Sequence, residues 1–168
     1  MSINIRKEQA KDVQSIHEVT VAAFLDAPHS DHTEQFIVNT LRESGALSIS
    51  LVAEDDHNIV GHVALSPITI SDRTGSWYGL GPISVLPDKQ GKGIGSKLMN
   101  AAIHELKNIK AKGCVLLGDP HYYHRFGFKP GKGLVLPDVP AEYFQALVFQ
   151  GSLPQGSVTY HESFAAKG

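Results

Sequence analysis

Residues 86–95 read LPDKQGKGIG and join two regular stretches of the chain. Before them, residues 83–86 read as the end of an apolar strand. After them, apolar residues recur at helical spacing over 94–110. The first N–H groups of a helix lack partners and carry partial positive charge, and glycine lets backbone approach a ligand closely. The stretch therefore predicts a phosphate-binding turn, to which Lys89 and Lys92 add positive charge.

Two common phosphate motifs do not fit this turn. No Gly-Lys-Ser/Thr follows at P-loop spacing, and G-x-G-x-G differs from the dinucleotide fingerprint G-x-G-x-x-G. The arrangement Q-x-x-G-x-G instead resembles the pyrophosphate-binding motif of the GNAT superfamily of N-acetyltransferases. Gln90, Gly93 and Gly95 match its fixed positions. The resemblance implies that the cofactor is bound by Gln90, Gly91, Lys92, Gly93, Ile94, Gly95 and Ser96.

A second stretch, residues 115–128, strengthens the resemblance. In the superfamily a strand is followed by a short helix with a tyrosine four residues before a Gly-Phe pair, and the spacing from Tyr123 to Gly127 fits. The sequence GDPHYYHRFGF is similar to the corresponding segment of the bacterial YhbS-like branch. The similarity extends to the segments 50–54, 59–63 and 156–160, and so covers nearly the whole chain.

The order of elements predicts one α/β domain over residues 1–168. The resemblance implies a GNAT-like fold, with a central mixed and splayed β-sheet flanked by helices. The patterns place strands at 3–5, 48–54, 59–66, 76–86 and 114–118, closing strands at 144–149 and 157–160, and amphipathic helices from Val13, from the segment after Asp31 and over 94–110. Asp31 is expected to cap the second helix, and Asp119-Pro120 to start a short one.

Composition excludes several classes of protein. The 168 residues contain no apolar run long enough for a membrane span, and the start MSINIRKEQA lacks the apolar core of a signal peptide. A single cysteine, Cys114, suits a reducing compartment. The net charge of −2 gives no basic field for nucleic acid. We therefore expect a cytoplasmic protein with no nucleic-acid or membrane partner, and the sequence is compatible with a homodimer.

The resemblance implies acetyl-CoA as co-substrate, with a polarised thioester carbonyl. In the superfamily the strand before the loop splays and exposes backbone amides, which here would come from Ile83, Ser84 and Val85. Gly81-Pro82 would explain such an irregularity because proline cannot donate to a strand ladder. An ordinary strand end is the alternative.

Tyr123 is the candidate catalytic acid, because it matches the tyrosine that donates to the leaving sulfur. A phenol with a pKa of about 10 can serve a thiolate whose conjugate acid has a pKa near 8.5. The alternative is a core aromatic beside Phe126 and Phe128. Tyr122 is expected to pack or to contact the cofactor. Arg125 is expected at the surface or beside a carboxylate.

The sequence does not identify a general base. Some superfamily members carry a glutamate on the strand before the loop, but residues 77–82 contain no acid. The region expected to line the acceptor side offers His29, Asp31, His32 and Glu34, and a chain of water molecules is equally compatible.

No metal site is expected. His29-x-Asp31-His32 and His121-x-x-His124 could each supply two ligands, but loop histidines are more often simply solvated, and no cysteine pair supports them. Cys114 lies in an apolar strand and is expected to be inert. The chain has no G-x-S-x-G elbow of a serine hydrolase.

These observations predict an enzyme that transfers an acetyl group from acetyl-CoA directly to a primary amine of a small molecule or protein. The alternative is a non-catalytic acyl-CoA-binding or sensor module that keeps the loop without turnover. The acceptor, the base, the oligomeric state and a donor longer than acetyl-CoA stay open.

Overall fold

The computed structural model describes residues 2–28 and 30–168. Its strands are β1 (Ile3–Lys7), β2 (Ile49–Asp55), β3 (Asn58–Pro67), β4 (Thr69–Ile70), β5 (Trp77–Val85), β6 (Gly113–Leu117), β7 (Lys129–Pro130), β8 (Leu134–Val135), β9 (Phe144–Val148) and β10 (Gly156–Thr159). Its α-helices are α1 (Val13–Phe24), α2 (Glu34–Glu43), α3 (Ile94–Asn108) and α4 (Pro120–Tyr123). Short 3₁₀ turns lie at Ala10–Asp12, Pro87–Lys89, His124–Phe126, Ala141–Tyr143 and Glu162–Ala165.

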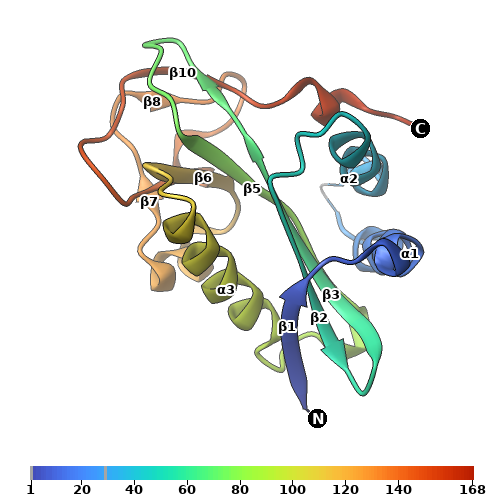
Figure 1. Cartoon of the computed structure of the whole chain (residues 1–168). Coiled ribbons are helices and arrows are strands. Elements are labelled where there is room, and N and C mark those ends of the chain that lie inside the picture. The colour runs from blue at the N-terminus through green and yellow to red at the C-terminus, as the bar shows by residue number, and fades with distance from the viewer. Residues whose placement is uncertain (1, 29) are drawn as a thin grey trace.

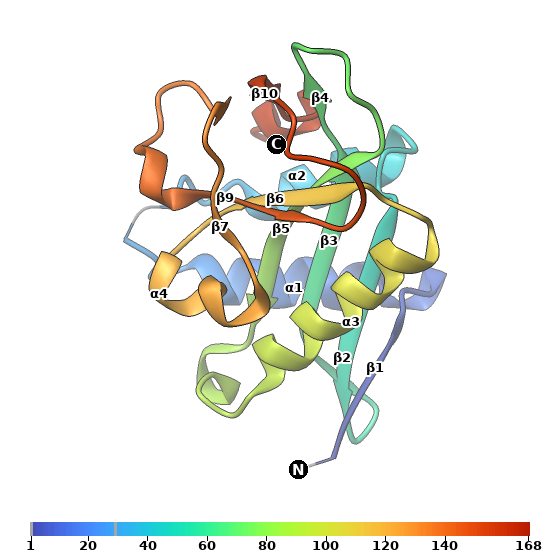
Figure 2. The same cartoon turned by 90° about the vertical axis from the view of Figure 1, so that its left-hand side faces the viewer.

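The main sheet has the strand order β1-β2-β3-β5-β6-β9-β7. Its neighbours are antiparallel except for β5 and β6, which are parallel, so the sheet is mixed as the sequence predicted. Helices α1 and α2 cover one face, and α3 and α4 lie on the other (Figures 1 and 2). The α/β architecture with a helix-flanked mixed sheet is confirmed.

The hydrophobic core lies mainly between α3 and the sheet. Helix α3 buries a stripe of apolar side chains at helical spacing: Ile94, Leu98, Met99, Ala102 and Leu106. On β2, Leu51 and Ala53 face this core, whereas Val52 points to the other face and packs with Ile16 of α1 and Val38 of α2. This alternation determines which side chains of the strand point toward each layer of helices.

The sheet splays between its two parallel strands. Only Trp77, Tyr78 and Gly79 of β5 pair with β6, at Gly113, Cys114 and Val115. Beyond this point β5 keeps only β3 as a neighbour, and Figure 2 shows β5 and β6 running in different directions. The register between β3 and β5 shifts between Val63 and Leu65, opposite Gly81-Pro82, where the sequence predicted an irregularity. The far half of β5 thus has one open edge.

Two expectations about local structure were wrong. The N-cap of α2 is Thr33, not Asp31, and no side chain caps this helix. The last strand, β10, does not close the main sheet: it joins a separate three-stranded sheet in the order β4-β10-β8. This small sheet packs Ile70, Leu134 and Val158 against Trp77, so burial of apolar surface determines its position rather than pairing in the main ladder.

Candidate active site

The glycine-rich turn joins the open end of β5 to α3. Gly91 and Gly93 adopt left-handed φ values of 76° and 83°, and Gly93 is the N-cap of α3, without a side-chain cap. A Cβ atom at either glycine would meet nothing within 4 Å. Backbone conformation rather than lack of space therefore requires glycine here, and the uncapped N–H groups of α3 stay available to an anion.

Gln90 closes the turn onto the strand. Its side-chain amide Nε2 donates to the carbonyl oxygen of Val85 at 3.0 Å. This hydrogen bond fixes the distance between the strand end and the helix start, which are the two sources of free N–H groups. The residue that matched the motif by spacing thus has a structural role of its own.

The strand alternation shows which N–H groups face the open edge of β5. The N–H of Leu86 donates to Val60 on β3, and Ser84, two residues earlier, has the same orientation. The carbonyl of Val85 points the other way, to Gln90, so the N–H groups of Ile83 and Val85 face the open edge. This differs from the expectation for Ser84, whose N–H faces β3.

A cavity of about 550 Å³ lies between this edge, the turn and α4. It is lined by Ile83, Val85, Lys89, Gln90, Gly91, Gly93, Ile94, Gly95, Ser96, Tyr122, Tyr123 and Arg125. All the sequence-predicted residues are therefore brought together here except Ser84, which is buried on the opposite face, and Lys92, whose exposed side chain is not part of the lining.

Two cationic residues of the lining were not predicted as cofactor contacts. Lys89 was noted only as local charge, and its Nζ lies 3.8 Å from the Asp55 carboxylate. The guanidinium of Arg125 stacks 4.4 Å from the centre of the Tyr122 ring, and its Nε donates to the Tyr122 carbonyl. Arg125 is exposed, which agrees with the first of its two expected placements, and its contact is an aromatic ring rather than a carboxylate. The three-residue spacing, one helical turn, is the signal that could have revealed this contact.

Tyr122 and Tyr123 present their rings to different parts of the cavity. The Tyr122 hydroxyl lies 3.3 Å from Ser96 Oγ in the first turn of α3. The Tyr123 ring packs on Gly118, where any Cβ atom would overlap it. Burial, with smaller contributions from Tyr122 and Asp119, raises the pKa of Tyr123 to about 12. Its hydroxyl therefore stays protonated across the physiological range.

The helix that carries both tyrosines begins as the sequence predicted. Asp119 is the N-cap of α4, and its side chain accepts a hydrogen bond from the N–H of His121 at 2.9 Å. Gln145 Nε2 donates to the Gly118 carbonyl at 3.0 Å. The turn beneath Tyr123 is thus held by a cap and by a buried amide from β9.

Comparison with known proteins shows the family to which the chain belongs. A model of the acetyltransferase (GNAT) domain matches residues 46–130. The chain belongs to the GNAT family.

Several GNAT relatives resemble the chain closely. The "uncharacterized N-acetyltransferase YhbS" of Escherichia coli K12 is 34% identical over 110 residues, which are 65% of this chain and 66% of that protein. A crystal structure of a GNAT family acetyltransferase from Brucella melitensis in complex with acetyl-CoA is 47% identical, with a TM-score of 0.87 over 97% of this chain and 98% of that one. The structure of E. coli YhbS in complex with CoA is 30% identical, with a TM-score of 0.88 over 99% and 93% of the two chains. The resemblance to the YhbS-like branch of the GNAT family is confirmed.

The described candidates for a general base, Asp31, His32 and Glu34, lie just before α2 and at its first residue. Of the predicted candidates, Glu34 accepts hydrogen bonds from Ser30, and Asp31 and His32 are exposed. His29 lies outside the described residues. Within residues 2–28 and 30–168, no three or more His, Cys, Asp or Glu side chains gather as a metal site would require. Burial raises the pKa of the Cys114 thiol, which agrees with an inert core residue.

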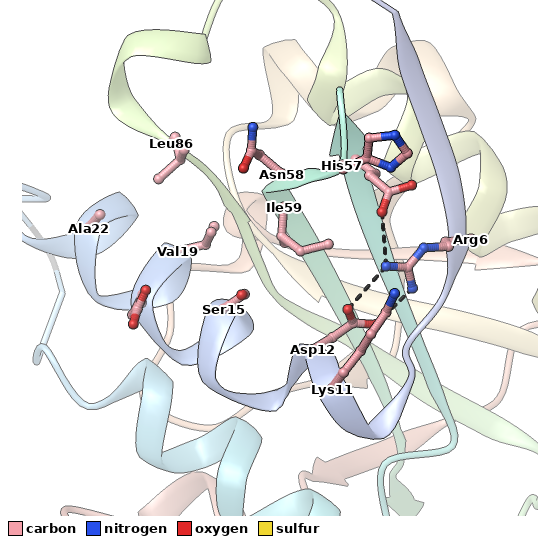
Figure 3. A pocket seen from close by; sticks show the side chains of 12 residues that line it. Arg6, Lys11, Asp12, Ser15, Val19, Ala22, His57, Asn58, Ile59 and Leu86 are labelled. Carbon is pink, nitrogen blue, oxygen red and sulfur yellow. Dashed lines mark hydrogen bonds and ion pairs between the residues drawn. The ribbon is translucent and has the colours of Figure 1, made fainter.

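A second cavity, of about 530 Å³, lies beside α1 and the β2–β3 turn (Figure 3). Arg6 crosses it and binds Asp12 at 2.7 Å and Glu54 at 3.1 Å. Hydrogen bonds from Arg6 hold the pKa values of both carboxyls below their usual range. The two carboxylates share one guanidinium, and the contacts join three segments of chain, so we assign them a structural role. In the described part of the chain, no helix is both long and apolar enough to span a membrane.

Proposed function

We propose that this GNAT protein transfers the acetyl group of acetyl-CoA directly to a primary amine of a small molecule or a protein. One observation carries the proposal. A single cavity brings together an uncapped helix N-terminus, two outward-facing N–H groups on β5 and the protonated hydroxyl of Tyr123. These are an anion site, a pair of oxyanion donors and a hydrogen-bond donor for the leaving sulfur, which together meet the demands of acyl transfer from a thioester.

The lining residues fit coenzyme A. The free N–H groups around Gly93 and Gly95 suit the pyrophosphate, and Lys89 and Arg125 add positive charge at its edges. The open edge of β5 suits an extended chain with amide groups, because β5 has hydrogen-bonding capacity there that no strand uses. The relatives solved with acetyl-CoA and with CoA support this assignment.

The chemistry follows from the placement of these groups. The neutral amine forms a C–N bond to the thioester carbonyl carbon, and the oxygen gains negative charge. The N–H groups of Ile83 and Val85 are the donors available to that oxygen. When the C–S bond breaks, the electron pair goes to sulfur, and Tyr123 donates a hydrogen bond to it.

In this scheme Tyr123 is a hydrogen-bond donor whose hydroxyl stays protonated throughout the reaction. With a pKa raised to about 12, full transfer of its proton to a thiolate is unfavourable, because the conjugate thiol has a pKa of about 8.5. We therefore assign it the stabilisation of the developing negative charge on sulfur. The thiolate then takes its proton from solvent, and the acetylated amine releases its extra proton to solvent.

A second function is favoured by one specific feature. The segment Trp77–Pro82 carries no carboxylate that could deprotonate an incoming ammonium group. A non-catalytic acyl-CoA sensor would need the cavity and no base.

The deciding experiment measures thiol release from acetyl-CoA with a panel of amines that includes polyamines, amino sugars, amino-acid derivatives and lysine peptides. We expect at least one amine to accelerate thiol release, with the N-acetylated product seen by mass spectrometry. If acetyl-CoA binds and no amine of any class accelerates release, the sensor is the correct function.

A further inference from the structure

A row of polar side chains crosses four strands on the face covered by α1 and α2. Glu8 follows β1, and its N–H donates to the Ser50 carbonyl of β2 at 3.0 Å. On β3, His62 lies opposite Val52 of β2 and opposite Ser84 of β5. Val52 packs against α1 and α2, so residues directly opposite it share that face. The row leads from the surface to the strand that lines the cavity.

The outer part of the row is fully hydrogen bonded. Arg42 of α2 forms two bonds to the Glu8 carboxylate, at 2.7 and 2.9 Å. Ser50 Oγ donates to Glu8 at 2.6 Å, because an ionised carboxylate can only accept. Ser50 Oγ therefore accepts from His62 Nε2, which lies 2.8 Å away. The bonding pattern assigns the proton of a neutral His62 to Nε2 and leaves a lone pair on Nδ1.

The inner part of the row is not bonded. His62 Nδ1 and Ser84 Oγ are both fully buried and have no partner among the described residues. Their residues are 0% and 2% exposed. A buried polar group without a hydrogen-bond partner destabilises the folded state. Because the two residues form a directly opposite pair, their Cα atoms lie roughly 5.5 Å apart, and both side chains leave the same face of the sheet.

We propose that an internal water molecule bridges His62 Nδ1 and Ser84 Oγ, and that His62 acts through this water as a positioning residue for β5. The water donates one hydrogen to Nδ1 and exchanges a second hydrogen bond with the serine hydroxyl. Buried water molecules in proteins pair with polar groups that otherwise have no partner, as these two groups have none among the described residues.

The bridge matters because of where Ser84 lies. It is between Ile83 and Val85, whose N–H groups face the cavity, in the part of β5 that has no neighbour on its other side. Through the water, the row ties this segment to the Glu8–Arg42 ion pair. A shift of the strand by a fraction of an ångström would misplace the oxyanion donors, so this role rests on the proposed function.

The direct test is a high-resolution crystal structure of the wild-type protein. We expect a water within hydrogen-bond distance of both His62 Nδ1 and Ser84 Oγ. A well-ordered map with no water there, or with a direct bond between the two side chains, overturns the bridge. This arm needs no substrate, so its failure is distinguishable from failure of the proposed function.

The positioning role is tested by Ser84→Ala against Ser66→Ala. Ser66 is a matched control, because it is also buried with an unpaired hydroxyl but lies on β3 opposite Gly79. With an amine that supports turnover, we expect Ser84→Ala to lower kcat roughly tenfold while acetyl-CoA affinity holds. Ser84→Thr, which restores a hydroxyl, should recover much of the loss, and Ser66→Ala should stay within about twofold. Equal kcat for the two alanine variants, with folding confirmed, would reject the role.

Discussion

The rings of the adjacent residues Tyr122 and Tyr123 meet at 89° with their centres 4.9 Å apart. Tyr122 turns its hydroxyl toward Ser96 in α3, whereas Tyr123 lies on Gly118 at the end of β6. Two chemically identical side chains on one short helix therefore reach different parts of the same cavity. This divergence lets substitution separate chemistry from packing.

Replacing Tyr123 with phenylalanine should slow turnover without loss of cofactor binding. The ring keeps its packing on Gly118, and only the hydroxyl proposed to face the sulfur is lost. We expect kcat to fall roughly 10²–10³-fold, as when one donor to developing charge is removed. Tyr122→Phe is the control and should change kcat far less. Near-wild-type rates for both variants would assign Tyr123 to the core and leave the β5 amides as the main catalytic contribution.

Gly93→Glu should weaken acetyl-CoA binding at least tenfold, or about 1.4 kcal/mol, in calorimetric titration. The change puts a negative side chain at the N-cap of α3 and disfavours its left-handed φ of 83°. Gly45→Glu is a matched control, since Gly45 has a φ of 78° and equally open surroundings but lies just after α2. Similar affinities for the two variants would remove the basis for placing the pyrophosphate at this turn.

Removing the carboxylate of Asp12 should destabilise the fold. Asp12 accepts bonds from Arg6 and from the N–H of Gln9, both at 2.7 Å, and its side chain is 4% exposed. We expect Asp12→Ala to lower the free energy of unfolding by about 2–4 kcal/mol in urea denaturation, because Arg6 loses part of a largely buried pair. Asp55→Ala breaks the longer 3.8 Å contact with Lys89 and should cost less than about 1 kcal/mol. Equal losses would show that the network around Arg6 adds nothing.

Stability should fall as the pH drops from about 6.5 toward 5, and His62 is the cause. Burial lowers the pKa of His62 to about 4, an effect that Glu8 opposes and Arg42 reinforces. In the unfolded chain the His62 imidazole has a pKa of about 6.5, so it binds a proton below that pH. The folded chain does not bind this proton until the pH is much lower, so the free energy of unfolding decreases. The loss is complete once the pH is below about 4, and it amounts to at most about 3 kcal/mol.

The measurement is urea denaturation of the wild type and of His62→Gln across this range. Glutamine can still donate to Ser50 but does not titrate, so its stability should vary less between pH 6.5 and 5. An unchanged slope in His62→Gln would place the titrating group elsewhere.

Local chemistry made much of the site predictable. The turn at Gly91 and Gly93, the start of α3 and the Asp119 cap depend on residues close in sequence, and the structure has them where the pattern placed them. The same holds for the β2–β3 hairpin. In these places the conformational preferences of a few neighbouring residues decide the outcome.

Expectations that depended on distant partners were less accurate. The register between β5 and β3 determines which edge of β5 the Ser84 N–H faces. One extra residue of β5 near Gly81-Pro82 shifts that register. The strand pattern of β10 was correct, but alternation alone does not identify the partner strand, and packing on Trp77 placed it in the small sheet. The polar row from Glu8 to Ser84 joins residues 76 positions apart and leaves no local signature.

The brief contact between β5 and β6 also bears on aggregation. A strand edge with free N–H and C=O groups is normally a template on which other chains assemble into fibres, and proteins block such edges with charge or proline. Here the free edge of β5 lines the cavity beside α4 and the glycine-rich turn. Detachment of the segment from β6 onward would expose that template to other copies of the chain. We therefore expect that weakening the three residue pairs that join β5 to β6 would promote self-assembly.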